Sequence, residues 1–284
     1  MGKVEILESG FFSTIQDEGR LGFSKFGVPR SGAMDKTSFR LANALLGNQE
    51  NDACIEWVFQ APVLKFSAPT SISITGAFTE CFLNGVPVKM YSRIFVKKGD
   101  VFSLNFCKNK KYGYVGIRNG FLSDVRLESR SFFKSITSSP ILSKDDEIAY
   151  QKDEKSVMSF SSISDASYFD DHDKLMVYKG AEFDQLASVQ KRVLLNSEFT
   201  ISDQANRMAI QLIEKLKNTL PSMLTSPVLP GTLQLTPSGK LIVLMRDCQT
   251  TGGYPRVLQL SNKAIDIIAQ KRRGEKCKFQ LIEE

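Results

Sequence analysis

Short runs of alternating apolar and polar residues dominate the first half of the chain, as expected for half-buried β-strands. Ser71 to Ile74 alternates residue by residue, and so does Phe102 to Phe106, which follows a turn-like Gly-Asp pair. The Asn84–Gly85 pair is typical of a tight hairpin turn. The pattern therefore predicts several short strands joined by glycine-containing turns.

Two segments of the chain are predicted to be helices. From Asp35 to Leu46 the apolar residues recur every three or four positions, and Gly47 follows as a stop signal. A second helix is predicted from about Asn262 to Gln270, after which Gly274 turns the chain into a last strand over 276–281. These two segments predict a few helices within a mainly β protein.

The segment 152–173, KDEKSVMSFSSISDASYFDDHD, is rich in Ser, Asp and Lys and has weak periodicity. Such a composition predicts a long surface connection, so we expect one domain over 1–151 and another over 174–284. After it, apolar patterning resumes at 175–177, and Leu241 to Met245 has the composition of a buried strand.

One segment of the second half has an ambiguous pattern. Apolar residues from Ala205 to Leu216 repeat with helical period, and Ser202 could serve as an N-cap. The periodicity alone predicts a helix here.

Composition narrows the class of protein. The 284 residues contain 42% hydrophobic and 24% charged residues, as in an ordinary globular protein. The net charge is +6, but the lysines and arginines are scattered and form no basic stripe or nucleic-acid motif. We therefore expect no nucleic-acid partner, and the basic balance either favours an acidic protein partner or has no specific role.

The cysteines and the N-terminal segment predict the compartment. Five cysteines, an odd number without CxxC spacing, indicate reduced thiols in a cytosol. The first residues lack an apolar core of a signal peptide, and no apolar run approaches 18 residues. The prediction is a cytoplasmic protein without a membrane partner.

Several common chemistries are excluded by missing residues. Because the chain has a single histidine, His172, a His-rich zinc site cannot be built. His172 lies in the polar run DDHD, which is typical of a solvated loop. Neither GxxxxGK[ST] nor GxGxxG occurs, so the common ATP-binding and NAD-binding loops are absent. We expect no metal site.

Three clusters mix glycines with polar side chains. They are residues 14–20 (TIQDEGR), 27–35 (GVPRSGAMD) and 247–256 (DCQTTGGYPR), the last directly after the predicted strand 241–245. Glycines allow close backbone approach to a ligand, and the polar neighbours supply donors and acceptors. The clusters are either ligand-binding loops or structural turns, and residue chemistry alone leaves both readings open.

These clusters resemble a known family. The patterns T-x-Q-D-x-G-R and G-V-P-x-S-G-A-M-D match 14–20 and 27–35, and D-x-Q-T-T-G-G-Y-P matches 247–255. Further matches are T-G-A at 75–77, S-R-S at 129–131 and N-R-M at 206–208, although Ala209 stands where the family usually has Gly. Over nearly its whole length the chain resembles the family of 5-oxoprolinase C subunits, also called KipA-like or allophanate hydrolase subunit 2.

The resemblance implies a fold, a function and partners. The implied fold is mainly β, two cyclophilin-like β-barrel units with a few helices, and a turn at 206–208 followed by a strand instead of a helix. The implied function is opening of 5-oxo-L-proline to L-glutamate, driven by ATP, in a complex outside which the chain is inactive. The implied partners are a KipI-like protein and a LamB/YcsF-like protein, the other two subunits of that complex, with ATP bound together with them.

Two alternatives come from relatives within the same family. One is a KipA-like regulator that binds and antagonises a KipI-type histidine-kinase inhibitor. The other is a carboxyltransferase component of a biotin-dependent urea or allophanate pathway, which is disfavoured because no M-K-M biotin-attachment motif occurs. Only the enzyme and carboxyltransferase readings require a small-molecule site.

The resemblance also implies site residues, which we expect to line one or two polar pockets. Asp247 or Asp17 is a candidate base, and Arg20 and Arg207 are candidates for holding anionic groups. Structural ion pairs and backbone caps are the competing roles. The expected substrate-binding residues are Gln16, Ser31, Gly32, Met34, Asp35, Asn206, Gln234, Gln249, Thr250, Gly252, Gly253 and Tyr254.

Overall fold

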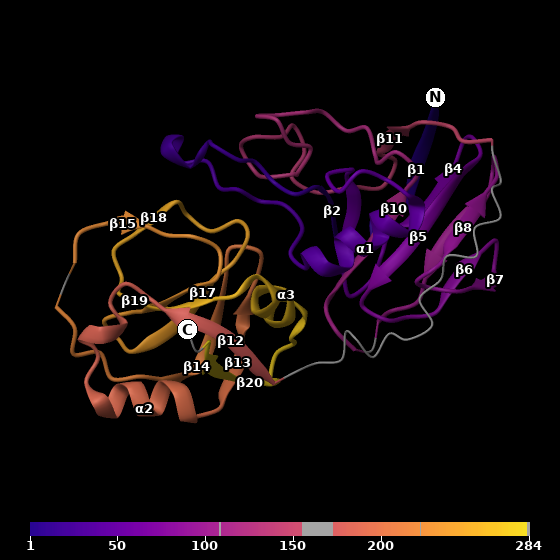
Figure 1. Ribbon diagram of the computed structural model, residues 1–284. Helices are drawn as coiled ribbons and strands as arrows, with labels where there is room; N and C mark the ends of the chain where they lie inside the picture. Colours follow the sequence, from indigo (N-terminus) through magenta and orange to yellow (C-terminus); the bar gives the residue numbers. More distant parts are fainter. Residues whose placement is uncertain (108, 155–172, 222, 283–284) are drawn as a thin grey trace. The chain divides into compact units, whose positions relative to one another are not determined.

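A computed structural model describes residues 1–107, 109–154, 173–221 and 223–282 (Figure 1). The chain divides into two compact units, residues 1–20 with 31–169 and residues 21–30 with 170–284. Most of the expected connection 152–173, including His172, lies outside the described residues. The boundaries of the two expected domains therefore stay a prediction.

The first unit is built from two antiparallel sheets around one core. The six-stranded sheet has the order β11-β1-β4-β9-β6-β7 and the five-stranded sheet the order β2-β3-β10-β5-β8. The strands are β1 (Gly2–Glu8), β2 (Phe12–Gln16), β3 (Cys54–Val58), β4 (Val63–Phe66), β5 (Thr70–Gly76), β6 (Cys81–Leu83), β7 (Val86–Val88), β8 (Arg93–Val96), β9 (Val101–Leu104), β10 (Tyr112–Ile117) and β11 (Glu147–Tyr150).

Helix α1 (Lys36–Leu46) covers the outer face of the five-stranded sheet, against β5 and β10 (Figure 1). The hydroxyl groups of Ser73 and Thr75 donate to carbonyls of the helix, at 2.8 and 2.7 Å. Because β5 has the core on one side and α1 on the other, all its residues are buried despite their alternation. The predicted helix is confirmed, with Asp35 as N-cap and Gly47 in the left-handed conformation as C-cap.

The predicted hairpin is also confirmed. Strands β6 and β7 pair with Leu83 opposite Val86, and Asn84 and Gly85 have φ values of 52° and 78°. Two consecutive residues with positive φ form the turn whose twist matches that of paired strands. The expected strand over Phe102 to Phe106 is too long, because β9 ends at Leu104 and the Cys107 amide donates to the Phe59 carbonyl at 2.8 Å.

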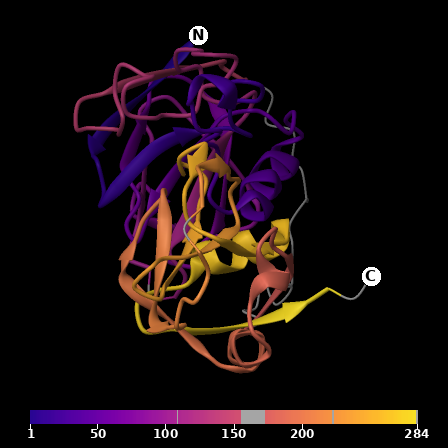
Figure 2. The same cartoon turned by 90° about the vertical axis from the view of Figure 1, so that its left-hand side faces the viewer.

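The second unit contains a closed seven-stranded barrel with the order β12-β19-β16-β17-β14-β13-β20. Its strands are β12 (Lys174–Lys179), β13 (Phe199–Ala205), β14 (Ala209–Lys215), β16 (Thr232–Leu235), β17 (Lys240–Leu244), β19 (Arg256–Leu260) and β20 (Lys276–Leu281). The barrel closes where β20, the yellow arrow leading to the C-terminus in Figure 2, pairs in parallel with β12. Closure leaves these strands without an open sheet edge.

Helices and short strands complete the second unit. They are α2 (Ser188–Asn196), α3 (Asn262–Gln270), the 3-10 turns η1 (Ser24–Phe26) and η3 (Phe183–Gln185), and the strand pair β15 (Ser226–Pro227) with β18 (Thr251–Gly252). The predicted helix over 262–270 and the predicted last strand are both confirmed. The chain is mainly β with a few helices, as predicted; the closed barrel lies in the second unit.

The segment with the ambiguous pattern forms a hairpin. Strands β13 and β14 flank a turn at Asn206, Arg207 and Met208. The turn and strand implied by the family resemblance are therefore confirmed, and the helix predicted from periodicity is wrong. The Asn206 side chain accepts hydrogen bonds from the amides of Met208 and Ala209, at 2.8 and 3.1 Å, which closes the turn locally. Pairing of β14 with β17 then outweighs helix propensity.

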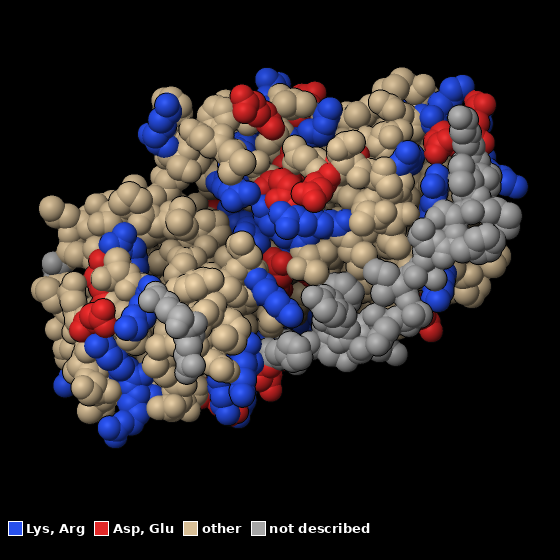
Figure 3. Space-filling view, viewed as in Figure 1, with Lys and Arg blue, Asp and Glu red and all other residues tan. Residues whose placement is uncertain are grey.

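The surface charges, the thiol groups and the lengths of the helices can each be compared with what the composition predicts. Lys and Arg side chains lie dispersed among acidic and uncharged residues on the face in Figure 3. Burial raises the pKa of Cys81 and Cys248 to about 12, so these thiols stay protonated near neutral pH. In the described part of the chain, every helix is too short or too polar to cross a membrane.

We predict that Gly113→Ala destabilises the first unit strongly. A Cβ at this position of β10 would lie 2.1 Å from the Trp57 ring, in a core that cannot expand. We expect a loss of about 3 kcal/mol in the free energy of unfolding, measured by urea denaturation. Gly253→Ala is the matched control, because its Cβ would meet nothing closer than 3.9 Å. Equal stability of the two variants would contradict this packing.

Candidate functional site

The Asp17 carboxylate is the centre of the first cluster. It is buried at the end of β2 and accepts hydrogen bonds from the Ser129 and Ser131 hydroxyl groups at 2.7 and 2.6 Å. The amides of Gly19 and Arg130 also donate to it, at 2.8 and 2.6 Å. Three of these donors reach Oδ1 and one reaches Oδ2. In the free chain it therefore fastens the 129–131 loop to β2.

Arg20 fastens the same loop from the other side. Its guanidinium donates to the carbonyl of Arg126 at 3.2 Å and to the carbonyl of Ser131. The side chain is buried, so these bonds also solvate the charge. Asp17 and Arg20 thus meet at Ser131, and both have the contacts of a structural residue. Their expected catalytic roles stay predictions.

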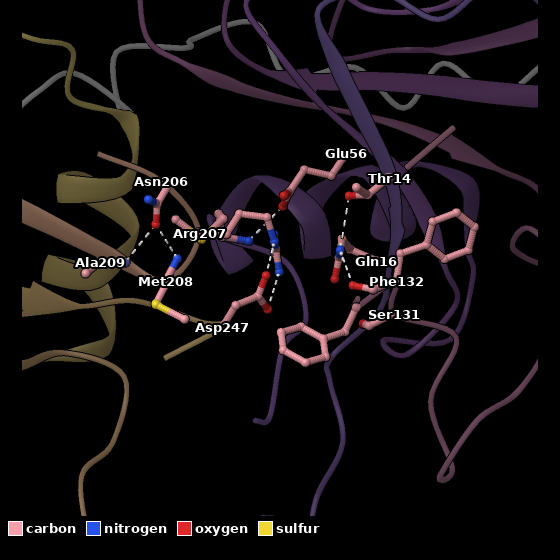
Figure 4. A network of polar contacts seen from close by, with 12 residues as sticks. Thr14, Gln16, Glu56, Ser131, Phe132, Asn206, Arg207, Met208, Ala209 and Asp247 are labelled. Atoms are coloured by element: carbon pink, nitrogen blue, oxygen red, sulfur yellow. Dashed lines mark hydrogen bonds and ion pairs between the residues drawn. The ribbon is translucent and has the colours of Figure 1, made fainter. Parts of the chain in front are cut away.

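The Gln16 side-chain oxygen and the Ser31 hydroxyl are buried polar groups without a hydrogen-bond partner among the described residues. The Gln16 amide nitrogen donates to Thr14 Oγ1 at 3.0 Å and to the Phe132 carbonyl at 3.3 Å, as Figure 4 shows, but its Oε1 accepts nothing. The Ser31 hydroxyl is likewise unpartnered, on a backbone with φ of 56°. Buried polar groups are normally satisfied, so these two are candidates for contacting a ligand.

The loop before α1 is held by a buried carboxylate and a phenol. The Met34 amide donates to Glu56 Oε2 at 2.7 Å, and the Tyr114 hydroxyl donates to the same oxygen at 2.8 Å. The Asp35 amide donates to the Tyr114 oxygen at 2.8 Å, while the Asp35 carboxylate caps α1. Burial raises the pKa of Tyr114, which keeps the phenol a donor.

Gly32 is required in that loop because it approaches other backbone closely. It has a φ of 88°, and a Cβ there would lie 2.9 Å from the backbone of Glu18 and Gly19. The Ala33 amide donates to the Asp17 carbonyl at 2.9 Å. Residues 31–35 and 16–20, separate motifs in the sequence, are therefore one hydrogen-bonded structure within the first unit.

The second unit carries its own polar pair. Arg207 and Asp247 form a two-pronged ion pair, Nε to Oδ2 at 2.7 Å and Nη2 to Oδ1 at 3.1 Å (Figure 4). Arg207 lies in the β13–β14 turn and Asp247 just after β17, and the Asp247 amide donates to the Arg207 carbonyl at 2.8 Å. Bidentate geometry fixes the guanidinium plane, which suits recognition of a carboxylate or phosphate.

The loop that follows Asp247 is held at its base by the buried side chain of Gln234 in β16. Its amide donates to the Tyr254 carbonyl at 3.3 Å, and a Cβ on Gly252 would lie 2.6 Å from its nitrogen. The Thr250 carbonyl accepts from the Val228 amide, whereas Gln249, Gly253 and Tyr254 are exposed. The loop is thus rigid at its base and presents polar groups at its tip.

Arg256, at the end of the same loop, connects it to Glu182, the residue before η3. Its guanidinium forms a two-pronged pair with Glu182, at 3.0 and 2.7 Å, and its amide donates to the same carboxylate at 2.7 Å. The hydrogen bond from the Arg256 side chain holds the pKa of Glu182 below its ordinary value, although burial acts in the opposite direction.

The expected site residues did not include four of the residues that organise these loops: Glu56, Tyr114, Ser129 and Ser131. A carboxylate within the apolar strand CIEWV is a usable signal for Glu56, because burial of a charge requires donors. The S-R-S triplet was visible, but nothing in it indicated a contact with Asp17.

Among the described residues, no three His, Cys, Asp or Glu side chains are placed to hold a metal.

Residues 26–281 match the family model of the carboxyltransferase domain, subdomain A and B. The chain belongs to this family. Within it, the chain is 31% identical to the 5-oxoprolinase C subunit of Haemophilus influenzae, over 98% of this chain and 91% of that protein. It is 26% identical to the 5-oxoprolinase C subunit of Escherichia coli, over 97% and 90% respectively. The resemblance seen in the sequence motifs is confirmed.

Other relatives contain this domain within much longer chains. Urea amidolyase of Lachancea kluyveri is 37% identical over 45% of this chain and 7% of that protein. The solved structure of Kluyveromyces lactis urea amidolyase superimposes with a TM-score of 0.89 at 24% identity, over 99% of this chain and 19% of that one. The urea carboxylase of the same yeast gives 0.87 at 23% identity, over 99% and 27%. These structures confirm the fold.

We predict that Asp17→Asn destabilises the first unit. An amide presents one acceptor oxygen and places its own donor against the serine hydroxyl groups and amides that now face a carboxylate. The expected loss is about 3 kcal/mol in the free energy of unfolding. Asp124→Asn, at an exposed carboxylate, should change it by less than about 0.5 kcal/mol. Equal effects in chemical denaturation would show that Asp17 is not a loop fastener.

The lowered pKa of Glu182 predicts that the stability of the second unit depends on pH. Because its pKa is lowered in the folded chain, its contribution to stability is present above the ordinary value of 4.5 and is lost as pH falls through the lowered value. Glu182→Gln should therefore reduce stability at pH 7 and flatten the acid side of a melting-temperature profile. An unchanged acid limb would contradict the Glu182–Arg256 assignment.

Proposed function

We propose that this chain is the C subunit of an ATP-dependent 5-oxoprolinase, which opens 5-oxo-L-proline to L-glutamate together with two further proteins. The observation that supports this most is similarity to two 5-oxoprolinase C subunits along nearly the full length of both chains. The loops that carry the shared motifs are also the ones that contain Arg207, Gln249 and Tyr254.

The Arg207–Asp247 pair suits the anionic part of this substrate. 5-Oxoproline carries a carboxylate, and a guanidinium already held in its plane by Asp247 loses little conformational freedom when it binds one. We assign Arg207 to holding the carboxylate or a phosphate, with Asp247 as the residue that positions it or orients water.

The unpartnered atoms of the first unit suit a lactam, and they are an alternative to Arg207 as the place where the substrate binds. A lactam N–H is a donor and its carbonyl an acceptor, which complement Gln16 Oε1 and the Ser31 hydroxyl. A lactam is a poor electrophile, so fixed donors near its carbonyl oxygen would stabilise the charge that develops during opening. Asp17 and Arg20 would act by holding this loop in place.

ATP would be bound together with the partner proteins. It would activate the lactam carbonyl for attack, and this chain has no GxxxxGK[ST] loop to hold it. The expected partners are the KipI-like subunit, which we call the KipI-like partner, and the LamB/YcsF-like subunit, which we call the LamB-like partner. This chain alone should therefore be inactive.

A carboxyltransferase role is the second candidate. It is favoured by the family's description and by the urea amidolyase relatives, which share 37% identity with part of this chain. In that role Arg207 would hold a carboxylated cofactor or its acceptor. A KipA-like regulator would bind the KipI-like partner without turnover.

We predict that the purified chain hydrolyses 5-oxoproline only when mixed with the KipI-like partner, the LamB-like partner and ATP. Glutamate release is the measurement. Arg207→Ala should lower kcat/KM at least ~100-fold, and Arg207→Lys should restore little, because a point charge cannot form the two-pronged pair with Asp247.

Lys276→Ala is the matched control, since it removes an exposed ion pair in the same unit and should leave turnover unchanged. Turnover by the isolated chain, or full activity of Arg207→Ala, would refute the assignment. Biotin-dependent carboxylation of urea by a reconstituted mixture would favour the carboxyltransferase role instead.

A further inference from the structure

The side-chain amide of Gln16 is fixed in one orientation. The residue is fully buried at the end of β2, and its nitrogen donates to Thr14 Oγ1 at 3.0 Å and to the Phe132 carbonyl at 3.3 Å. A backbone carbonyl can only accept a hydrogen bond, so the atom that faces Phe132 must be the nitrogen. Figure 4 shows two dashed lines that leave this nitrogen and none that reaches the amide oxygen.

The segment that carries the Phe132 carbonyl is itself held in place. The Phe132 amide donates to the Ile15 carbonyl at 2.8 Å, which pairs this segment with β2. One residue earlier, the Ser131 hydroxyl donates to the Asp17 carboxylate at 2.6 Å. Asp17 therefore acts on Gln16 through this segment, because it helps to fix the carbonyl that sets the direction of the amide.

The Gln16 oxygen is thus a fixed acceptor, and it has no donor within the described part of the chain. An acceptor buried in this way opposes folding, because it has lost its hydrogen bonds to water without replacing them. Rotation of the amide would not relieve this cost, since it would break both bonds of the nitrogen and turn the oxygen towards the Phe132 carbonyl. A donor from outside the chain would satisfy the oxygen without any rotation.

A second buried polar group lies on the neighbouring loop. The Ser31 hydroxyl is buried and has no partner among the residues that the structure describes. The Ala33 amide donates to the Asp17 carbonyl at 2.9 Å, which joins this loop to the chain directly after Gln16. A hydroxyl can donate, whereas an amide oxygen can only accept. Ser31 can therefore bind a carbonyl oxygen, and the Gln16 oxygen requires an N–H or O–H.

A lactam ring presents a donor and an acceptor side by side. Ring closure holds its amide in the cis form, so the N–H and the carbonyl oxygen lie on the same edge, whereas the trans amide of a peptide points them in opposite directions. Replacing the ring N–H with an oxygen atom or a methylene group removes the donor and leaves the carbonyl in place. An acceptor beside the N–H therefore distinguishes a lactam from rings of the same shape.

We propose that Gln16 determines specificity for the ring nitrogen: its oxygen accepts a hydrogen bond from the lactam N–H and so selects cyclic amides over similar rings that lack this donor. Ser31 donates to the ring carbonyl, which both kinds of ring have. A buried group that binds an N–H rejects an analogue without it, because the group is then left unpaired. This inference rests on the proposed function, and it places the lactam ring in the first unit, which leaves a phosphate for Arg207.

The test compares 5-oxoproline with its cyclopentanone analogue, in which a methylene group replaces the ring N–H. Both dissociation constants are measured without ATP on the complex of this chain with the KipI-like partner and the LamB-like partner, by dialysis of labelled 5-oxoproline and its displacement. We expect the wild-type complex to bind 5-oxoproline at least ~10-fold more tightly than the analogue. Gln16→Met, which keeps the side-chain length and removes the amide, should reduce this ratio to about twofold or less.

Ser31→Ala is the matched control, because the carbonyl that Ser31 binds is present in both ligands. It should raise both dissociation constants by a similar factor, about tenfold, and leave their ratio unchanged. A purely structural role of Gln16 would give this same result for Gln16→Met, so the ratio separates recognition of the N–H from support of the fold.

Glutamate release by the wild-type complex after addition of ATP separates this inference from the proposed function. If that complex releases glutamate but binds the analogue as tightly as 5-oxoproline, the specificity assignment is overturned and the function stands. This result needs no variant, so it decides the question even where Gln16→Met does not fold. A folded Gln16→Met that keeps the wild-type ratio overturns the assignment as well. If the wild-type complex neither binds 5-oxoproline nor releases glutamate, the proposed function itself fails.

Discussion

Buried carboxylates that accept hydrogen bonds from polar loops are the constraint on which the glycine-rich loops of the first unit depend. Asp17 accepts four hydrogen bonds, two of them from backbone amides, and Glu56 accepts from the Met34 amide and from Tyr114. Without such acceptors, glycine-rich loops could not be buried against a sheet, because each unsatisfied amide costs free energy. In the second unit the partly buried Asp247 carboxylate instead pairs with the Arg207 guanidinium.

The strands place these carboxylates and the loops carry the exposed groups. Asp17 follows β2 and Asp247 follows β17, so each acid stands where a rigid element ends. The tips beyond them, such as Gln249 and Tyr254, are exposed and anchored at their base by Gln234. A loop tip can thus vary its contacts while the base of the loop stays in position.

Local patterns in the amino-acid sequence determined much of the secondary structure. Caps and periodicity specified α1, α3 and the hairpin at Asn84–Gly85, because those signals act within a few residues. The motifs also identified the family. They could not decide the segment 205–216, where helical spacing and strand pairing compete and only β17 as a neighbour settles the outcome. The roles of the polar residues were decided by tertiary structure. Asp17 and Asp247 look alike in sequence, each near a glycine-containing motif, yet one accepts from serines and amides while the other pairs with an arginine 40 residues away. Hydrogen-bond partners and neighbouring rings come from distant parts of the chain, so no local pattern contains them.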